Sequence, residues 1–219
     1  MHKVKVLKTE FITHNVRHFV VERPAGYTFI SGQATDVSIN KPGLENELRP
    51  FTFTGLNSGE NLEFTIKIYP DHHGVTEKLG TIVAGDELIL HDVFGVINYK
   101  QPGLFIAGGA GITPFISILR QLKADNKLEG NTLLFANHTE KDIILKDELS
   151  EMLGSNFINV ISNPELPETH AQTVDRDMIK QYLNGQANYY ICGPDPFVEA
   201  MTTYLKELGI QQSQIVVEE

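Results

Sequence analysis

The 219-residue sequence predicts a two-domain protein, an N-terminal antiparallel β-barrel (1–99) followed by a C-terminal α/β domain on an open parallel sheet (100–219). Three observations predict this fold. The length suits two domains of about 100 residues each. Apolar residues of the first half recur with a period of two, whereas the second half has short apolar runs separated by helix-period segments. The segment NYKQPG (98–103) is the expected linker.

The first half consists of short strand patterns between Gly, Pro and Asn residues. In NLEFTIKIYP (61–70), every second residue is apolar: Leu62, Phe64, Ile66 and Ile68. This is the pattern of a strand with one buried face. Similar runs are VKVLKTEFI, VRHFVVE, ATDVSI and DELILHDV. Several short strands of this kind favour a small antiparallel barrel.

The second half alternates between apolar runs and helix patterns. The runs GLFIA, TLLFA, NFINVI and NYYIC are typical of buried parallel strands. One helix follows Pro114, with apolar residues at the i, i+3, i+4 and i+7 positions Phe115, Ile118, Leu119 and Leu122. For a second helix, we expect Asp195 to cap, Pro196 to open and Gly209 to close. Strand–helix alternation predicts βαβ units.

Composition narrows the function classes. A net charge of −10 argues against a broad nucleic-acid surface. The single cysteine, Cys192, excludes an internal disulfide and a cluster held by four thiolates of this chain. Adjacent His72 and His73 lack the spacing of zinc motifs, so we expect no metal site. No apolar run approaches the roughly 20 residues of a membrane-spanning helix, and no signal peptide is recognised. We therefore expect a cytoplasmic protein.

The stretch LFIAGGAGITPFISILR (104–120) runs from a strand through a glycine-rich loop into a helix. Free backbone N–H groups and the helix dipole favour an anion at such a point. The side-chain-free loop Gly108–Gly111 would let a pyrophosphate approach the backbone. A tight packing turn between strand and helix is the alternative explanation.

Two further unusual segments also follow predicted parallel strands, ANHTEKD (136–142) and CGPDP (192–196). Ligands of open parallel sheets bind beyond the carboxyl ends of the strands. All three loops would then face one crevice, which a packing turn alone does not predict. The convergence favours a dinucleotide site.

The barrel half contains a second candidate site at RPFTFTGLN (49–57). In a strand, Arg49 and Phe51 share one face, and Pro50 and Thr52 share the other. Arginine can bind a phosphate, an aromatic ring can cover a flat ring, and a hydroxyl can bond a ring nitrogen. Composition also allows an edge strand with an exposed, salt-bridging arginine. Downstream, Gly74–Thr76 opens a short helical stretch that could hold a second phosphate.

Four of these segments, Arg49–Thr52, Gly74–Thr76, Gly108–Pro114 and Cys192–Pro194, resemble motifs of the ferredoxin–NADP reductase superfamily, and the resemblance covers essentially the whole chain. The resemblance implies that Arg49 holds the flavin phosphate, Phe51 lies against the isoalloxazine ring, Thr52 bonds near N5, and Cys192 lies near the nicotinamide. Thr52 and Cys192 are thus the implied catalytic residues. The implied cofactor-binding residues are Arg49, Pro50, Phe51, Thr52, Ile66, Lys67, Ile68, Tyr69, Gly74, Val75, Thr76, Gly108, Gly109, Ala110, Gly111, Ile112, Thr113, Pro114, Asn137, His138, Cys192, Gly193 and Pro194.

The resemblance further implies FAD as cofactor, with FMN second, and NADH or NADPH as co-substrate. A 2′-phosphate would favour an arginine after the second parallel strand, where Asn137 and His138 stand instead, so NADH is favoured. The segment LLFANHTEKDIIL is similar to NADH–cytochrome b5 reductases. The short chain without a cluster is similar to bacterial flavodoxin or ferredoxin reductases and to the reductase half of flavohaemoglobins. The subgroup stays open.

The implied activity is hydride transfer from the nicotinamide to the flavin, followed by electron transfer to a flavodoxin, ferredoxin or haem protein. The alternatives are a reductase that uses flavin as a dissociable substrate and a non-enzymatic dinucleotide-binding module. One departure concerns the ending QIVVEE, where many relatives have a terminal aromatic residue. Tyr69 could cover that flavin face, and Glu218 or Glu219 could lie near the flavin. A frayed acidic tail is the alternative.

Overall fold

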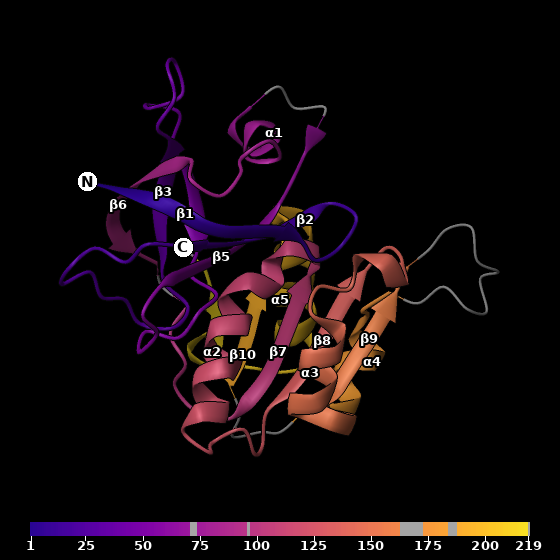
Figure 1. Cartoon of the computed structure of the whole chain (residues 1–219). Helices are drawn as coiled ribbons and strands as arrows, with labels where there is room; N and C mark the ends of the chain where they lie inside the picture. Colours follow the sequence, from indigo (N-terminus) through magenta and orange to yellow (C-terminus); the bar gives the residue numbers. More distant parts are fainter. Residues whose placement is uncertain (71–73, 96, 163–172, 184–187, 219) are drawn as a thin grey trace.

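The computed structural model of the protein describes residues 1–70, 74–95, 97–162, 173–183 and 188–218 (Figure 1). It has two parts, a barrel-like sheet from the first half of the chain and a parallel sheet with helices from the second. His72, His73 and Glu219, which entered the expectations above, lie outside the described residues.

The first half forms a six-stranded antiparallel sheet in the order β4-β3-β6-β1-β2-β5. Its elements are β1 (His2–Phe11), β2 (Val16–Val21), β3 (Ala34–Ile39), β4 (Arg49–Thr52), β5 (Leu62–Lys67), the short helix α1 (Val75–Leu79) and β6 (Glu87–Phe94). The two edge strands meet through an antiparallel bridge between Phe53 and Phe64. This bridge closes the sheet into a barrel, as the sequence predicts.

Barrel closure produces a core on the side that the period-two pattern predicts. Leu62, Phe64, Ile66 and Ile68 are all buried, together with Phe53. Register in such a sheet is set by the buried face, because a slip of one residue would expose every apolar side chain of the strand.

The second half forms a five-stranded parallel sheet in the order β11-β10-β7-β8-β9. The strands are β7 (Gly103–Gly108), β8 (Thr132–Asn137), β9 (Phe157–Ile161), β10 (Asn188–Cys192) and β11 (Ile215–Val217). The helices are α2 (Thr113–Ala124), α3 (Lys146–Leu153), α4 (Arg176–Gln181) and α5 (Asp195–Glu207). The predicted fold class, barrel plus open parallel sheet, is confirmed.

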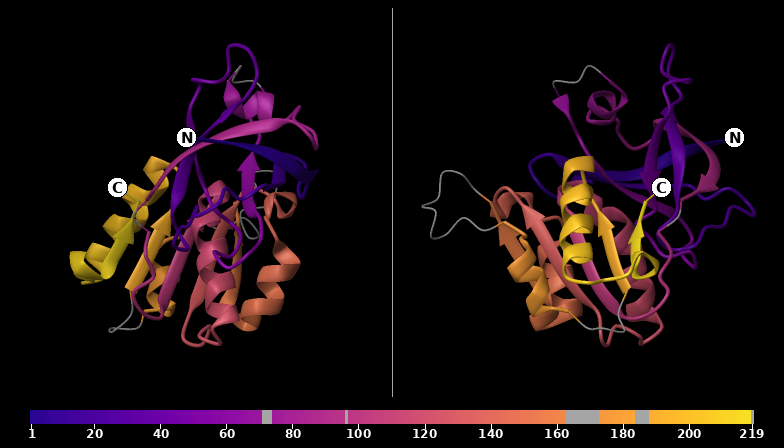
Figure 2. Two further views of the ribbon diagram at one scale, coloured as in Figure 1. Left: turned by 60° about the vertical axis from the view of Figure 1, so that its left-hand side comes forward. Right: turned by 180° about the vertical axis from the view of Figure 1, so that it is seen from behind.

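Helices cover both faces of the parallel sheet (Figures 1 and 2). α2 and α3 pack on one face, where Phe115, Ile118, Leu119 and Leu122 are buried as their spacing predicts. α4 and α5 pack on the opposite face, mainly through Ile179, Met201 and Leu205. The sheet is therefore the middle layer of an α/β/α arrangement.

The start of α5 differs from expectation. Asp195 is the first helical residue rather than the cap, and the N-cap position belongs to Pro194, which makes no side-chain cap hydrogen bond. The carbonyl of Pro194 accepts instead from the N–H groups of Phe197 and Val198. At the other end, Gly209 has a φ of +84° and follows the helix as predicted.

None of the described helices has the length and apolar character needed to span a bilayer.

Candidate active site

A cavity of about 710 Å³ lies between the barrel and the carboxyl ends of the parallel strands. The barrel contributes Ala34, Pro50, Phe51, Thr52, Thr65, Ile66, Lys67, Tyr69 and Thr76. The parallel-sheet half contributes Gly108, Gly109, Ala110, Gly111, Thr113, Ala136, Asn137, His138, Asp142, Ser162, Cys192, Gly193, Pro194, Phe197 and Glu218. The convergence that the sequence predicts for the three loops is observed.

Six residues of the predicted set do not line this cavity. Ile68, Val75, Ile112 and Pro114 are buried in the core, and Gly74 is the N-cap of α1. Arg49 is exposed, and its Nη1 donates to the carbonyl of Leu48 at 2.6 Å. Among the described residues Arg49 forms no ion pair, so an exposed arginine is observed but a salt-bridging one is not.

Four lining residues were not predicted from the sequence: Ala34, Thr65, Ser162 and Phe197. Ala136 and Asp142 were not named singly, but both belong to the segment 136–142 that was expected to face the crevice. Ser162 directly follows β9, so the rule that selected Asn137 and Cys192, at the ends of β8 and β10, would have selected it as well. Phe197 carries no such signal, because its place depends on how α5 packs.

The glycine-rich loop serves both packing and the cavity. A Cβ on Gly111 would collide with the backbone carbonyl of Cys192, and one on Gly108 would lie 3.0 Å from the Phe197 ring. These two glycines are explained by close packing between β7, β10 and α5. Gly109 is different, because its φ is +52° and, apart from its chain neighbours, no described atom lies within 4 Å of where a Cβ would stand. Its backbone is therefore open to the cavity.

Cys192 is a buried thiol beside a carboxylate. Its Sγ lies 3.8 Å from Oε2 of Glu218 and can donate to it. Burial, followed by the negative charge of Glu218, raises the pKa of Cys192 to about 12. The side chain is therefore a neutral thiol near pH 7 and is not activated as a nucleophile.

The short strand β11 explains why Glu218 is there. Its residues pair in parallel with β10, with Val217 opposite Ile191. This pairing carries the chain past Cys192 and brings Glu218 into the cavity wall. Up to Val217 the tail is therefore held by the sheet, and Glu218, which follows the strand, lies beside Cys192 as the resemblance allowed.

Asn137 presents an unpaired amide to the cavity. The residue is 6% exposed, yet neither its Oδ1 nor its Nδ2 has a hydrogen-bond partner among the described residues. Buried polar groups are normally paired, and an unpaired one costs about 1–3 kcal/mol. The cavity wall therefore contains a donor and an acceptor that the described residues leave unpaired.

A carboxylate lies on the same wall. Asp142 accepts from the N–H and hydroxyl of Thr139, at 2.9 and 2.7 Å, and Nε2 of His14 lies 3.6 Å away. Burial would raise the pKa of Asp142, but the bonds from Thr139 and the charges of His14 and Lys67 hold that pKa below its ordinary value. Asp142 is therefore ionised at neutral pH.

Similarity to known proteins agrees with this geometry. The family model of the oxidoreductase NAD-binding domain matches residues 105–203. NADH–cytochrome b5 reductase 1 of Arabidopsis thaliana is 31% identical over 227 residues, covering 94% of this chain and 79% of the relative. The chain belongs to the ferredoxin–NADP reductase superfamily.

Other members of the superfamily extend the picture. The reductase component of propane 2-monooxygenase from Rhodococcus jostii is 30% identical over 208 residues, covering 88% of this chain and 55% of that protein. The chain thus spans about half the length of that relative. A ferredoxin NADP+ reductase from Neisseria gonorrhoeae, solved with bound FAD and NADP, has the same fold, with a TM-score of 0.83, 18% identity and coverage of 99% and 97%. The resemblance inferred from the four motifs is confirmed.

The contact between Cys192 and Glu218 gives a testable prediction. Iodoacetamide should alkylate the native protein very slowly at pH 7.5, and the rate should rise only as the pH approaches the raised thiol pKa. In Glu218→Gln the carboxylate charge is gone, so the rate profile should move to lower pH. Mass spectrometry follows the reaction cleanly, since the chain has one cysteine. Unfolded protein is the control, and a native profile equal to it would contradict the assignment.

Proposed function

We propose that the chain is an NAD(P)H-dependent flavoprotein reductase that binds FAD on its barrel side and a nicotinamide dinucleotide at the carboxyl ends of its parallel strands. The reductase class follows from the superfamily. The observation that carries the proposal is the single cavity formed by both halves, which gathers residues of all four motifs. Two cofactors that must exchange a hydride need one shared space.

On the barrel side, FAD is proposed to lie against Phe51, Thr52 and Tyr69. All three line the cavity, and Tyr69 is 38% exposed with the Lys67 ammonium 5.6 Å from its ring centre. Arg49 is proposed to bind the flavin phosphate. Its exposure and its lack of an ion pair among the described residues leave the guanidinium available for a bidentate phosphate contact.

On the nucleotide side, Gly109 and Asn137 fit a dinucleotide. The open backbone at Gly109 accommodates a pyrophosphate. The amide of Asn137 offers one donor and one acceptor, which suits the hydroxyl groups of a ribose. NADH is proposed as the preferred nucleotide, because the described lining residues of this half include no arginine or lysine and do include ionised Asp142. A 2′-phosphate would therefore find no cationic partner among these residues.

When bound, the nicotinamide would supply a hydride and the flavin would accept it, so the redox chemistry would belong to the cofactors. The contribution of the chain is position and environment. Cys192 adds a neutral thiol at the end of β10, and Thr52 a hydroxyl at the end of β4. Phe51 of the barrel and Phe197 of α5 line the cavity with aromatic rings. This half-reaction requires no strong acid or base.

The electron acceptor is proposed to be a protein, with flavodoxin, ferredoxin and haem proteins as the candidates. In support, the relatives include a reductase component of a monooxygenase and reductases named for cytochrome b5 and ferredoxin. The domain boundary near residue 99 and the cytoplasmic location remain predictions from the sequence.

The flavin site is tested with Arg49→Ala. The wild-type protein should retain FAD through gel filtration, whereas Arg49→Ala should bind FAD at least about tenfold more weakly, because a charge-assisted contact to phosphate is worth about 1.5–3 kcal/mol. Fluorescence titration of the apoprotein measures both affinities. Far-UV circular dichroism should be unchanged. Arg176→Ala, an exposed arginine of α4, is the matched control. Equal FAD affinity in wild type and Arg49→Ala would refute the assignment, and a wild type that loses its flavin would favour the dissociable-flavin alternative.

The nucleotide site and the activity are tested together with Asn137→Ala. With ferricyanide as an artificial acceptor, FAD-loaded protein should oxidise NADH, and the variant should show a KM for NADH raised by about tenfold, the loss of roughly 1–2 kcal/mol of hydrogen bonding. The variant should be as stable as wild type, because it removes an unpaired buried amide.

Asn131 provides the matched control. It is fully buried, but its amide accepts from the Gly103 N–H and donates to backbone carbonyls, including that of Leu128 at 3.1 Å. Asn131→Ala should lower the free energy of unfolding by about 1–3 kcal/mol and leave the KM for NADH unchanged. Urea unfolding measures stability. If Asn137→Ala lost stability with an unchanged KM for NADH, and Asn131→Ala showed the raised KM, the proposal for Asn137 would be wrong.

A further inference from the structure

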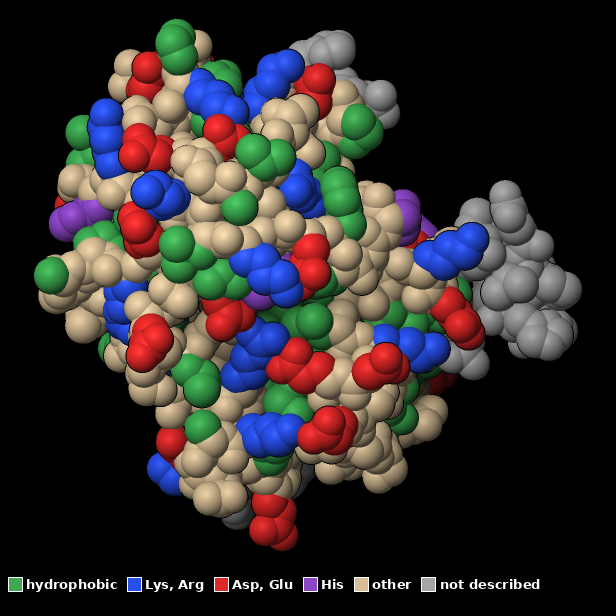
Figure 3. Space-filling model, in the orientation of Figure 1, with side chains coloured by type: hydrophobic (Ala, Val, Ile, Leu, Met, Phe, Trp, Pro, Cys, Tyr) green, Lys and Arg blue, Asp and Glu red, His purple; other side chains and the backbone are tan. Residues whose placement is uncertain are grey.

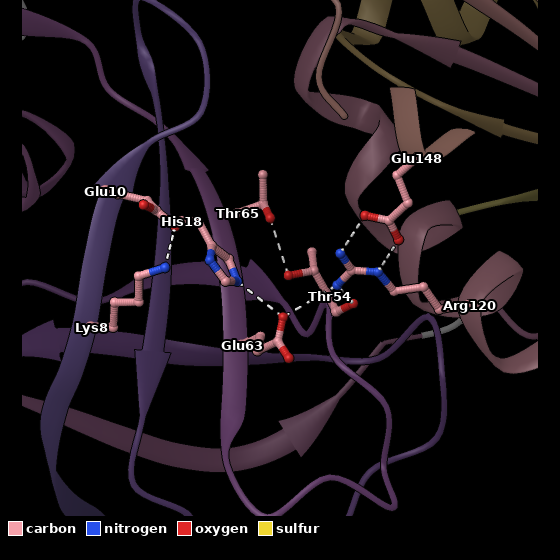
Figure 4. Close-up of polar contacts among 8 residues, drawn as sticks. All are labelled: Lys8, Glu10, His18, Thr54, Glu63, Thr65, Arg120 and Glu148. Carbon is pink, nitrogen blue, oxygen red and sulfur yellow. Dashed lines mark hydrogen bonds and ion pairs between the residues drawn. The ribbon is translucent and has the colours of Figure 1, made fainter. Parts of the chain in front are cut away.

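Arg120 of α2 lies where the two halves of the chain meet (Figure 4). Its Nε and Nη2 donate to the two carboxylate oxygens of Glu148 in α3, at 2.6 and 2.8 Å. This two-point contact fixes the guanidinium plane to the parallel-sheet half. The remaining nitrogen, Nη1, crosses to the barrel, where it donates to the carbonyl of Thr54 at 2.8 Å and to Oε2 of Glu63 at 3.3 Å.

Glu63 continues the contact into the barrel. Its Oε2 lies 3.0 Å from Nε2 of His18 on the neighbouring strand β2. The hydrogen bond with His18 lowers the pKa of Glu63, burial opposes this, and the charge of Arg120 lowers it further. Glu63 is therefore ionised at neutral pH. We call the series His18–Glu63–Arg120–Glu148 the interface ion-pair chain.

On the barrel side, the two acceptors of Arg120, Thr54 and Glu63, lie next to residues that line the cavity. The N–H of Thr54 donates to the carbonyl of Glu63 at 2.8 Å, and the Thr54 hydroxyl lies 3.1 Å from that of Thr65. Thr65 lines the cavity, as does Thr52, two residues before Thr54. Arg120 is thus bonded to the strand pair that supplies the proposed flavin side of the cavity.

On the other side, the same residue belongs to the helix that continues the glycine-rich loop. Thr113, the first residue of α2, lines the cavity, and Arg120 follows it by about 10 Å along a continuous helix. Because a helix is stiff over this length, holding Arg120 also holds the start of α2. The guanidinium therefore connects the two opposite walls of the cavity.

Other polar contacts cross this interface without the same anchoring. The Gly32 N–H donates to the Ser117 hydroxyl at 2.9 Å, and His14 approaches Asp142 at 3.6 Å. Each is a single contact. Arg120 combines a two-point anchor in one half with two acceptors in the other, and its side chain is only 20% exposed. Solvent screening is therefore weaker here than at a surface pair.

We propose that Arg120 is a positioning residue for the reaction, which sets the spacing between the flavin side and the nucleotide side of the cavity through the interface ion-pair chain. The inference rests on the proposed function. Hydride transfer depends steeply on the separation of the reacting atoms, and a misplacement of about 1 Å can cost about 100-fold in rate. Loss of Arg120 should therefore slow the transfer without removing either cofactor site.

The test compares Arg120→Gln with Lys123→Gln. Lys123 stands on the same helix and pairs with Glu151 of α3 at 2.9 Å. Figure 3 shows basic and acidic side chains side by side on this face of the molecule. No hydrogen bond or ion pair joins Lys123 to a described residue of the barrel, so it is a matched control for the loss of an α2–α3 ion pair. Glu63→Gln removes the charge of the barrel partner of Arg120 and leaves the two-point contact with Glu148 in place.

Anaerobic stopped-flow bleaching of bound FAD by NADH gives the limiting rate and the NADH dissociation constant separately. For Arg120→Gln we expect the limiting rate to fall at least about tenfold, with FAD content and NADH dissociation constant within about twofold of wild type. Lys123→Gln should match wild type, and Glu63→Gln should fall in between. A purely structural role would instead reduce FAD content and thermal stability.

A second readout needs no turnover. Lys3 in β1 and Lys127 after α2 are exposed, so the substitutions Lys3→Cys and Lys127→Cys can each carry a spin label. Pulsed electron paramagnetic resonance then measures the distance between the two halves. Cys192 is buried and protonated, so it reacts little with the label. Arg120→Gln should broaden this distance distribution, and Lys123→Gln should not.

The outcomes separate the two proposals. An unchanged limiting rate in FAD-loaded Arg120→Gln, or an equal loss in Lys123→Gln, overturns the positioning role. If Arg120→Gln does not fold, Glu63→Gln decides in the same way. If NADH fails to bleach wild-type FAD, the proposed function fails, and the label distances alone decide whether Arg120 orders the two halves.

Discussion

The position of the cavity depends on a change of direction in the parallel sheet. From β7, the chain proceeds to β8 and β9 on one side, and it later returns to β10 and β11 on the other. The helix after β7 therefore packs on one face, and the helix after β10 packs on the opposite face. The loops that leave Gly108 and Cys192 diverge, and a crevice opens between them, which is where ligands of such sheets bind. The barrel supplies the facing wall.

Around the cavity, the hydrogen bonding and packing of a residue distinguish a proposed ligand contact from a structural role. Asn131 directly precedes β8 and Asn137 ends it, and both are buried, but only the amide of Asn131 is paired with described residues. Likewise, a side chain at Gly111 would collide with the carbonyl of Cys192, whereas the space beside Gly109 is open. Residue type alone gives no such distinction, because it arises from what each atom meets after folding.

Features that depend on local periodicity and on the order of elements along the chain could be predicted from the sequence. The strands, the α2 core positions and the convergence of three loops follow from short-range patterns together with the rule for parallel strand ends. The resemblance also identified the superfamily. It did not reveal that Arg49 lies outside the cavity, nor that β11, a strand of three residues, brings Glu218 to Cys192. So short a strand has no periodicity to detect. Arg120 was also missed, since an arginine on an amphipathic helix looks like any solvated surface charge until Thr54 and Glu63 are seen beside it.

The most direct measurement is an anaerobic titration of the FAD-loaded protein with NADH and, separately, with NADPH, followed by visible absorbance. The cavity, with Asp142 on its nucleotide side, predicts that NADH bleaches the oxidised flavin spectrum stoichiometrically and at lower concentration than NADPH. A protein that binds FAD but is bleached by neither nucleotide would show that the shared cavity does not support hydride transfer, and a protein that binds no FAD would leave the dinucleotide-binding module as the better explanation.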